Sequence, residues 1–218
     1  MTGDRLLIVD ASLAPLQAGL LVDGRITAAV SAGGEALDGI FETSAQLLRA
    51  EGLTHGDLDG YIYGAGPGTL LGLRLAAMAI EGWRSMRSGT VPVRQYITLS
   101  AAAAAHAHSG GPASFDMLVP VRRGLFARVS VRDGRAGPPQ LEKDGDTPEK
   151  TSALPRFHLP VPNRRLPPPP LAEAFRFEFT DLPAGWFSGP EVAAVAHPVP
   201  FNPSPAAYAE WTGGRHRA

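Results

Sequence analysis

The turn Gly66-Pro67-Gly68-Thr69, followed at once by a long apolar helix, is the feature that most constrains this chain. The strand-like run Leu58 to Ala65 precedes it. Glycine and proline let the backbone change direction there, and Thr69 is placed to act as the helix N-cap. Because strand, tight turn and helix in this order form the repeating unit of α/β domains, we expect such a domain in the first half of the chain.

Glycines between a strand and a helix N-terminus can bring backbone amides close to a phosphate, so nucleotide binding has to be considered. The spacing fits neither G-x-x-x-x-G-K-[ST] nor G-x-G-x-x-G. Of the 20 lysine and arginine residues only Lys143 and Lys150 are lysines, so residues 1–142 contain no phosphate-binding or Schiff-base lysine. We interpret the turn as a hinge that sets the direction of the following helix.

That helix, which we expect from about Thr69 to Met86, is apolar over most of its circumference, with small alanines between its larger side chains. A helix that covers a sheet needs only one apolar stripe, so its second apolar face must be buried by something else. The second half of the chain could cover it. The alternative is a helix of another subunit, which small alanines would allow to approach closely.

A second amphipathic helix is predicted from Glu35 to Glu51, with Gly52 as its C-cap. We expect helices 37–48 and 70–83 to lie side by side and to form a helix-bundle interface with a partner. The candidate interface residues are Leu37, Ile40, Phe41, Ser44, Leu48, Leu70, Leu73, Arg74, Ala76, Ala77 and Ile80.

The remaining runs of the first half predict strands at Leu6 to Asp10, Leu16 to Val22, Arg25 to Val30 and Val91 to Ile97. Asp23-Gly24 between two of them is a strong hairpin signal. An alanine-rich helix is expected from Leu99 to His108, with Thr98 or Ser100 as its cap. The predicted order is βββαβαβα in a mixed five-stranded sheet.

A boundary is predicted near the Gly110-Gly111-Pro112 stretch, which gives an N-terminal lobe at 1–111 and a smaller α/β lobe at 112–218. Runs 115–121 and 125–131 predict a second hairpin around Arg122-Arg123-Gly124. The proline-rich segment 133–170 is expected to be loop or polyproline rather than packed core. Pro190 can open a short helix that continues to Val195.

Composition excludes several classes of site. The chain has no cysteine, so disulfides and thiolate sites are absent, and a net charge of −1 makes any RNA role local or indirect. The N-terminal run Leu6 to Val9 is too short for a signal sequence or a membrane span, so we expect a cytoplasmic protein without a membrane role.

His106 and His108 are spaced i, i+2 on a helix, so no metal site is expected. Four arginines cluster near the second hairpin: Arg122, Arg123, Arg128 and Arg132. Together with Arg164, Arg165, Arg215 and Arg217 they could touch RNA phosphates or be solvated charges.

The sequence resembles the TsaB (YeaZ) family, which belongs to the glycoprotease-like group of the actin-like ATPase superfamily. Val9-Asp10-Ala11-Ser12 matches the family's first strand ending in Asp-Thr-Ser, and Gly66 to Arg74 matches its Gly-Pro-Gly-Ser-Phe-Thr-Gly-Leu-Arg segment. Weaker matches are the Arg122-Arg123-Gly124 turn and Pro205 to Tyr208. Residues 133–190 show no match.

This resemblance implies a ribonuclease H-like, actin-like α/β fold and a non-catalytic subunit without a cofactor. Its partners would be a TsaD-like catalytic subunit and a TsaE-like ATPase, in making threonylcarbamoyladenosine in tRNA, or a second copy of itself. A vestigial nucleotide site would comprise Asp10, Ser12, Gly66 and Gly68.

Two alternatives stay open. One is an ATP-binding, kinase-like enzyme of the same superfamily, in which Asp10 would orient a metal-bound water or phosphate. Ala11 and Ser12 stand where the phosphate loops of such kinases need glycine, so we interpret Asp10 as a turn-capping carboxylate. The other alternative is a diverged homodimer that has no tRNA role.

Overall fold

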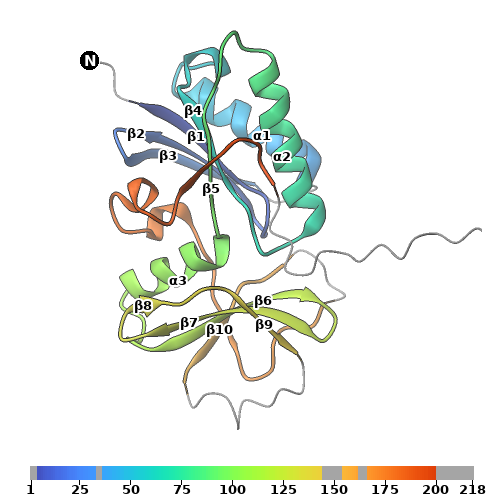
Figure 1. Ribbon diagram of the computed structural model, residues 1–218, viewed down its shortest axis with the longest axis vertical. Coiled ribbons are helices and arrows are strands. Elements are labelled where there is room, and N and C mark those ends of the chain that lie inside the picture. Colours follow the sequence, from blue (N-terminus) through green and yellow to red (C-terminus); the bar gives the residue numbers. More distant parts are fainter. Residues whose placement is uncertain (1–3, 33–35, 144–153, 162–165, 200–218) are drawn as a thin grey trace, which may run out of the picture.

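The computed structural model describes residues 4–32, 36–143, 154–161 and 166–199 and arranges them in stacked layers (Figure 1). The elements of the first half are β1 (Arg5–Asp10), β2 (Leu16–Val22), β3 (Arg25–Ala32), α1 (Ala36–Ala50), a 3-10 turn (His55–Asp57), β4 (Gly60–Gly64), α2 (Leu70–Ser85), β5 (Val93–Tyr96) and α3 (Thr98–His108). The predicted order βββαβαβα is confirmed.

The first sheet has the strand order β12-β5-β4-β1-β2-β3. Strands β1, β2 and β3 form an antiparallel meander, whereas β4 pairs parallel to β1 and to β5. Central strand β1 has both faces covered: Leu7 and Val9 pack toward α1 and α2, and Leu6 and Ile8 toward α3. A continuous apolar run suits this doubly covered position.

The second half forms a smaller sheet with the order β11-β10-β6-β7-β8, and β9 also pairs with β7. Its elements are β6 (Phe115–Arg122), β7 (Leu125–Arg132), β8 (Arg135–Ala136), β9 (Gln140–Lys143), β10 (Arg156–His158), β11 (Glu173–Ala174), two 3-10 turns (Phe179–Asp181 and Trp186–Ser188) and β12 (Ala193–Val195). The hairpin of β6 and β7 is where the sequence predicted it.

Helix α3 lies between the two sheets (Figure 1). Its alanines Ala101, Ala102, Ala103 and Ala105 are fully buried in a core cluster that holds residues of both sheets. A helix that is apolar all round is expected in such a position, and small side chains let two sheets close on it. The alanine-rich composition of α3 thus sets the spacing of the layers.

Two predictions for the second half are wrong. The segment Pro190 to Val195 is not a helix: Ala193–Val195 forms β12, which pairs antiparallel with β5 and makes the first sheet six-stranded rather than five-stranded. The segment 133–170 is not all loop, because it contains β8, β9 and β10 and buries Arg156 and Leu159. Backbone pairing with distant strands overrides the local composition in both places. The return of β12 to the first sheet also means that the chain crosses the predicted boundary at residues 111 and 112.

Helix ends follow the predictions in part. Gly52 ends α1 as expected, with Leu53 N donating to Leu48 O at 2.8 Å and Gly52 N to Arg49 O at 3.1 Å. Thr69 is the N-cap residue of α2, but its side chain makes no capping bond. The cap of α3 is Ile97, not Thr98 or Ser100. The reason for the last difference is that the Thr98 hydroxyl is bonded elsewhere.

In the part of the chain that the structure describes, no helix is long and apolar enough to cross a membrane. The Pro205 to Tyr208 match and the arginines at 164, 165, 215 and 217 lie outside the described residues.

His106 near the end of α3 is enclosed by aromatic rings. Its ring centroid lies 4.1 Å from that of Phe157, 4.8 Å from Phe175 and 4.9 Å from Phe115. Its Nε2 is buried and makes no hydrogen bond. Burial therefore lowers the pKa of His106 below its ordinary value of 6.5, against a smaller opposite effect of Glu173.

Acid should therefore destabilise the fold through this side chain. Because the folded state lowers the pKa of His106, the unfolded state binds more protons, and the contribution of the neutral ring is lost as the pH falls below about 6.5. We expect the free energy of unfolding, measured by urea titration, to fall between pH 7.5 and pH 5.5. His106→Leu should reduce that fall, whereas His108→Leu, at the exposed end of the same helix, should leave it unchanged. An equal pH dependence in all three proteins would contradict the assignment.

Candidate functional site at the glycine turn and the outer face of α2

Asp10 ends β1 and is buried, and four donors of the chain itself converge on its carboxylate. Oδ1 accepts from the Ser12 amide at 2.9 Å and from the Ser12 hydroxyl, and Oδ2 accepts from Tyr96 Oη at 2.7 Å and Thr98 Oγ1 at 2.8 Å. The bond to the Ser12 amide confirms the turn-capping interpretation. The carboxylate joins the ends of β1, β5 and α3.

Tyr96 shows the electrostatic consequence of this arrangement. Complete burial raises the pKa of the Tyr96 phenol well above its ordinary value, and the adjacent Asp10 charge raises it further. The phenol is therefore a permanent donor to Asp10. Charge-assisted bonds of this kind are about twice as strong as neutral ones, so the cluster holds the strand ends rigidly.

The glycine turn packs directly on this cluster. The Thr69 amide, at the start of α2, donates to Ser12 O at 2.8 Å, and the Thr98 amide donates to Gly66 O at 2.8 Å. A backbone amide at the helix N-terminus that could face a phosphate is thus bonded within the chain. Asp10, Ser12, Gly66 and Gly68, which the sequence predicts as a vestigial nucleotide site, do come together. Ser12 bonds to Asp10, and Thr69, Tyr96 and Thr98 occupy further acceptors of Asp10, Ser12 and Gly66.

Two glycines are required by close backbone approach. A Cβ at Gly68 would lie 2.2 Å from Ser12 O, and one at Gly72 would lie 1.9 Å from Ala11 O. Real Cβ atoms do not approach backbone this closely. The two glycines let the first turn of α2 rest on the Ala11–Ser12 backbone, and this contact sets the direction of the helix.

Most of the nominated interface residues face inward. Side chains buried against the first sheet or between the two helices are Ile40, Ser44, Leu48, Leu73, Ala76, Ala77 and Ile80. A partner cannot touch a buried side chain, so the prediction that these residues form the partner surface is wrong. Phe41, Leu70 and Arg74 are exposed, and nothing is described of the Leu37 side chain.

The outer face of α2, defined here as Leu71, Leu75, Met78 and Gly82, carries the exposed apolar surface of the helix. Leu71 and Met78 are 66% and 69% exposed, and Leu75 is half-buried between them. The four residues are spaced i, i+4, i+7 and i+11, which places them on one side of a helix. Nothing lies within 4 Å of the position that a Cβ of Gly82 would take. The face is therefore apolar and open at its C-terminal end.

An aromatic group borders this face on the side of α1. Phe41 contacts Trp83 edge to face at 5.8 Å, and His55 stacks on Trp83 at 4.4 Å. Trp83 is buried, whereas 46% of Phe41 is exposed. The rigid Trp83 ring holds Phe41 in place beside the outer face of α2.

The chain's own C-terminal segment borders the same helix elsewhere. Arg84 Nη1 donates to Ala196 O at 3.1 Å, His197 Nδ1 lies 3.2 Å from Glu81 Oε1, and Tyr63 Oη donates to Val199 O at 2.9 Å. Figure 1 shows this segment running from β12 across β4 toward α2. Among the residues that the structure describes, those of the C-terminal segment occupy the polar edge of α2 and leave its apolar face uncovered.

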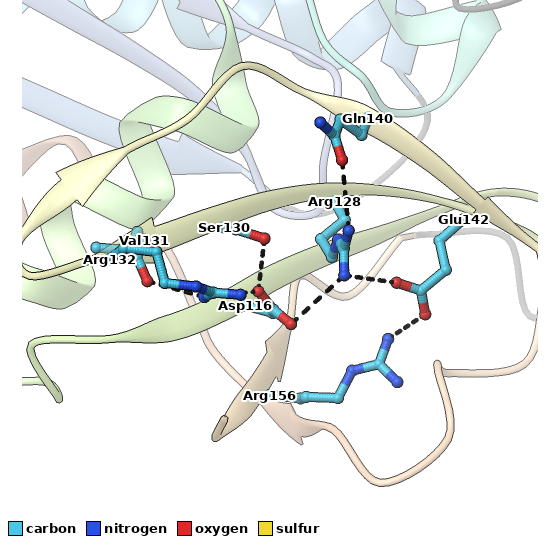
Figure 2. Close-up of polar contacts among 8 residues, drawn as sticks. All are labelled: Asp116, Arg128, Ser130, Val131, Arg132, Gln140, Glu142 and Arg156. Atoms are coloured by element: carbon cyan, nitrogen blue, oxygen red, sulfur yellow. Dashed lines mark hydrogen bonds and ion pairs between the residues drawn. The ribbon is translucent and has the colours of Figure 1, made fainter. Parts of the chain in front are cut away.

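Charged side chains on the second sheet form a network among themselves (Figure 2). Asp116 accepts from Ser130 at 2.7 Å and from Arg132 at 3.2 Å, and Arg128 lies between Asp116 and Glu142 at 3.7 and 3.4 Å. Arg156 completes the network by pairing with Glu142. Two of the four arginines considered for tRNA phosphates, Arg128 and Arg132, are thus ion-paired, and Arg122 and Arg123 are exposed on the hairpin turn.

Among the described residues, no three His, Asp or Glu side chains gather in a way that could hold a metal ion.

Comparison with known proteins identifies solved structures with a similar fold. No protein-family model matches the chain, and no curated protein sequence matches it. YeaZ from Pseudomonas aeruginosa superposes with a TM-score of 0.55 at 21% identity, over 69% of this chain and 70% of that one. A further crystal structure, of an uncharacterised protein with similarity to peptidase YeaZ from Pseudomonas aeruginosa, gives 0.55 at 19% identity over 71% and 74%.

The chain has the YeaZ fold. The actin-like, ribonuclease H-like fold class expected from the sequence is therefore confirmed, with its two mixed sheets. The resemblance carried by the Asp10 and Gly66 to Arg74 motifs is confirmed at the level of fold. In this YeaZ fold, the two motifs are the segments that pack on each other at the ends of β1 and β4.

Sequence reasoning missed Leu71 and Met78 as exposed residues of the site. The helical spacing in the sequence could have identified them, because Leu71, Leu75 and Met78 share the side of the helix that is opposite Ala76 and Ile80. The periodicity identifies two apolar sides, and only the packed sheet shows which side is covered.

The tight contact at Gly72 gives a stability test with a control on the same helix. Gly72→Ala should lower the free energy of unfolding by about 1–3 kcal/mol, because the new methyl overlaps Ala11 O and the helix must move. Gly82→Ala should raise it by about 0.5–1 kcal/mol, because its Cβ meets open space and alanine favours helix. Thermal or urea unfolding measures both. Equal effects at the two positions would show that α2 does not rest on β1 as described.

Proposed function

We propose that this chain is a non-catalytic partner subunit in the threonylcarbamoyladenosine modification of tRNA, and that it binds a TsaD-like catalytic subunit through the outer face of α2. The observation that carries the proposal is the apolar outer face of α2, where Leu71 and Met78 are exposed on either side of half-buried Leu75 while the opposite side of the helix is packed on the sheet. Side chains of this size are seldom left exposed together on one face unless they meet a partner. The Gly66 to Arg74 motif resembles that of the TsaB (YeaZ) family, and this resemblance supports a TsaD-like protein as the partner.

The shape of the face suits a helix of the partner. Gly82 leaves the C-terminal half of the face open for close approach of another helix, and Met78 adapts to irregular surfaces. Phe41, held by Trp83, adds a rigid aromatic side chain at the border. Arg74 is exposed in the same stretch of α2 and can form a polar rim.

The Asp10 cluster supports a subunit without catalysis. A catalytic carboxylate has to face its substrate, whereas both oxygens of Asp10 accept hydrogen bonds from Ser12, Tyr96 and Thr98. In this proposal a TsaE-like ATPase and tRNA meet the assembly through the catalytic subunit, and the chain acts in the cytoplasm. A second copy of this chain on the same face is the alternative occupant.

The interface is tested by charge on the outer face of α2. Met78→Asp and Leu71→Asp should each weaken the complex with the TsaD-like protein of the same cell at least about tenfold, because a buried unpaired carboxylate is costly. The matched control is Leu171→Asp, which alters a side chain that is 85% exposed on the second half of the chain and should leave binding unchanged. Co-purification and calorimetry measure the effect.

The same variants distinguish the two candidate partners, a TsaD-like protein and a second copy of this chain. If both α2 variants still bind the TsaD-like protein like the unaltered chain, the proposed interface is wrong. If no such complex forms and the same variants convert a dimer of this chain to a monomer in light scattering, the second copy is the occupant. Buried Leu73 and Ala76 are unsuitable for this test, because charge there would unfold the helix packing.

Nucleotide binding is tested separately. We expect calorimetry with Mg-ATP to give no saturable heat, because the Thr69 amide and both Asp10 oxygens are bonded within the chain. Saturable binding that Asp10→Ala abolishes, and that exposed Glu42→Ala does not, would favour the kinase-like alternative instead.

A further inference from the structure

A second concave site lies on the other side of the first sheet. A half-open cavity of about 360 Å³ is lined by the β2–β3 hairpin and by the segment with the two 3-10 turns. Figure 1 shows that segment below β2 and β3 and beside α3. Leu21, Phe179 and Phe187 of its walls belong to the core cluster that contains α3, whereas the buried residues of α2 belong largely to the opposite cluster.

The inner wall of this cavity adjoins the Asp10 cluster, because Tyr96 contacts Trp186 at 5.6 Å and Phe187 at 5.3 Å, whereas its rim lies at the other end of the strands. In the antiparallel pair of β1 and β2, Asp10 is opposite Gln17, and Arg5 is opposite Val22 beside the hairpin turn. The rim of the cavity at Gly24, Arg25 and Ile26 is thus at the far end of the sheet from the glycine turn. It takes no part in the proposed function.

Its floor is rigid, because the buried rings of Phe179 and Phe187 lie beneath it and the half-buried ring of Trp186 lies at its side. Phe187 contacts Phe179 at 5.8 Å and Trp186 at 5.1 Å, edge to face in both cases. The segment is tied to β2 by Gln17, whose side chain donates to Phe177 O and accepts from the Phe179 amide, each at 2.9 Å. The cavity therefore exists before any ligand arrives, which reduces the ordering cost of binding.

One charge lies at the rim. Of the described residues that line the cavity, Arg25 alone is charged, and its side chain is exposed. Within the described ranges, no ion pair or side-chain hydrogen bond engages its guanidinium. The hydroxyl of Thr180 and the indole N–H of Trp186, both in the lining, are further side-chain polar groups. An apolar aromatic chamber with a free cation at its mouth is complementary to an anion that has an apolar body.

We infer that this cavity binds a small carboxylate with an aromatic or branched apolar body, the apolar body against Trp186, Ile26 and Pro183 and the carboxylate on Arg25. Volumes of this order are typical of sites for small molecules. The planar guanidinium favours a carboxylate, which it can bind through two parallel hydrogen bonds. A neutral compound of the same shape would leave Arg25 without its anion.

The test uses 4-iodobenzoate as the probe, because iodine quenches the fluorescence of a nearby tryptophan. Titration of the full chain should give saturable quenching, and neutral 4-iodobenzamide should bind at least about tenfold more weakly. Arg25→Gln should weaken the binding of 4-iodobenzoate by a similar factor. Arg49→Gln, which alters an exposed arginine on α1, should leave that binding unchanged. Trp186→Phe should remove most of the quenching.

Further outcomes decide the inference without reference to α2. Ala184→Phe, in the exposed part of the lining, should fill the cavity and abolish saturation while leaving binding of the TsaD-like protein unchanged. Quenching that rises linearly with concentration, or that is the same for the amide and for Arg25→Gln, would overturn the inference. Saturable quenching that persists in Trp186→Phe would place the bound probe elsewhere and would overturn it as well.

Discussion

Four hydrogen bonds to the buried carboxylate of Asp10 hold together the ends of the central strands, and the position of α2 depends on this cluster. They come from Ser12, Tyr96 and Thr98, which belong to the ends of β1 and β5 and to the start of α3. A buried carboxylate without partners would be very costly, so these three segments cannot separate while the fold persists. Because the Ala11–Ser12 backbone is fixed by this cluster, it provides the surface on which the glycine turn and the first turn of α2 rest.

The direction of α2 follows from that contact. With Gly68 and Gly72 against Ser12 and Ala11, the helix lies on the sheet with Leu73, Ala76 and Ile80 inward. Leu71 and Met78 are then necessarily outward, since they lie on the opposite side of the helix. The glycines that resemble a phosphate loop thus act through steric fit, and their consequence is the orientation of an apolar face.

Local patterns predicted the first half of the chain well. The Asp23-Gly24 hairpin, the run Leu6 to Asp10 and the helix with its end at Gly52 all formed where the sequence placed them, because turn chemistry and periodicity act over a few residues. Failures occurred where a short segment takes its structure from a distant strand. Ala193–Val195 is a strand because β5 offers it an open edge, and Arg156 is buried because Glu142 neutralises it. Neither partner is visible in the local sequence.

The candidate site divides in the same way. The sequence by itself determined that Asp10 caps a turn, that Gly66 to Thr69 starts a helix and that this helix has more apolar surface than one sheet can cover. Only the tertiary structure decided that Ile40, Ser44, Leu48, Leu73, Ala76, Ala77 and Ile80 are inside and that Leu71 and Met78 are outside. The physical reason is that periodicity records how side chains are distributed around a helix axis, whereas the rotation of the helix about that axis is fixed by contacts between residues far apart in the chain, here those of Gly68 and Gly72 with the end of β1.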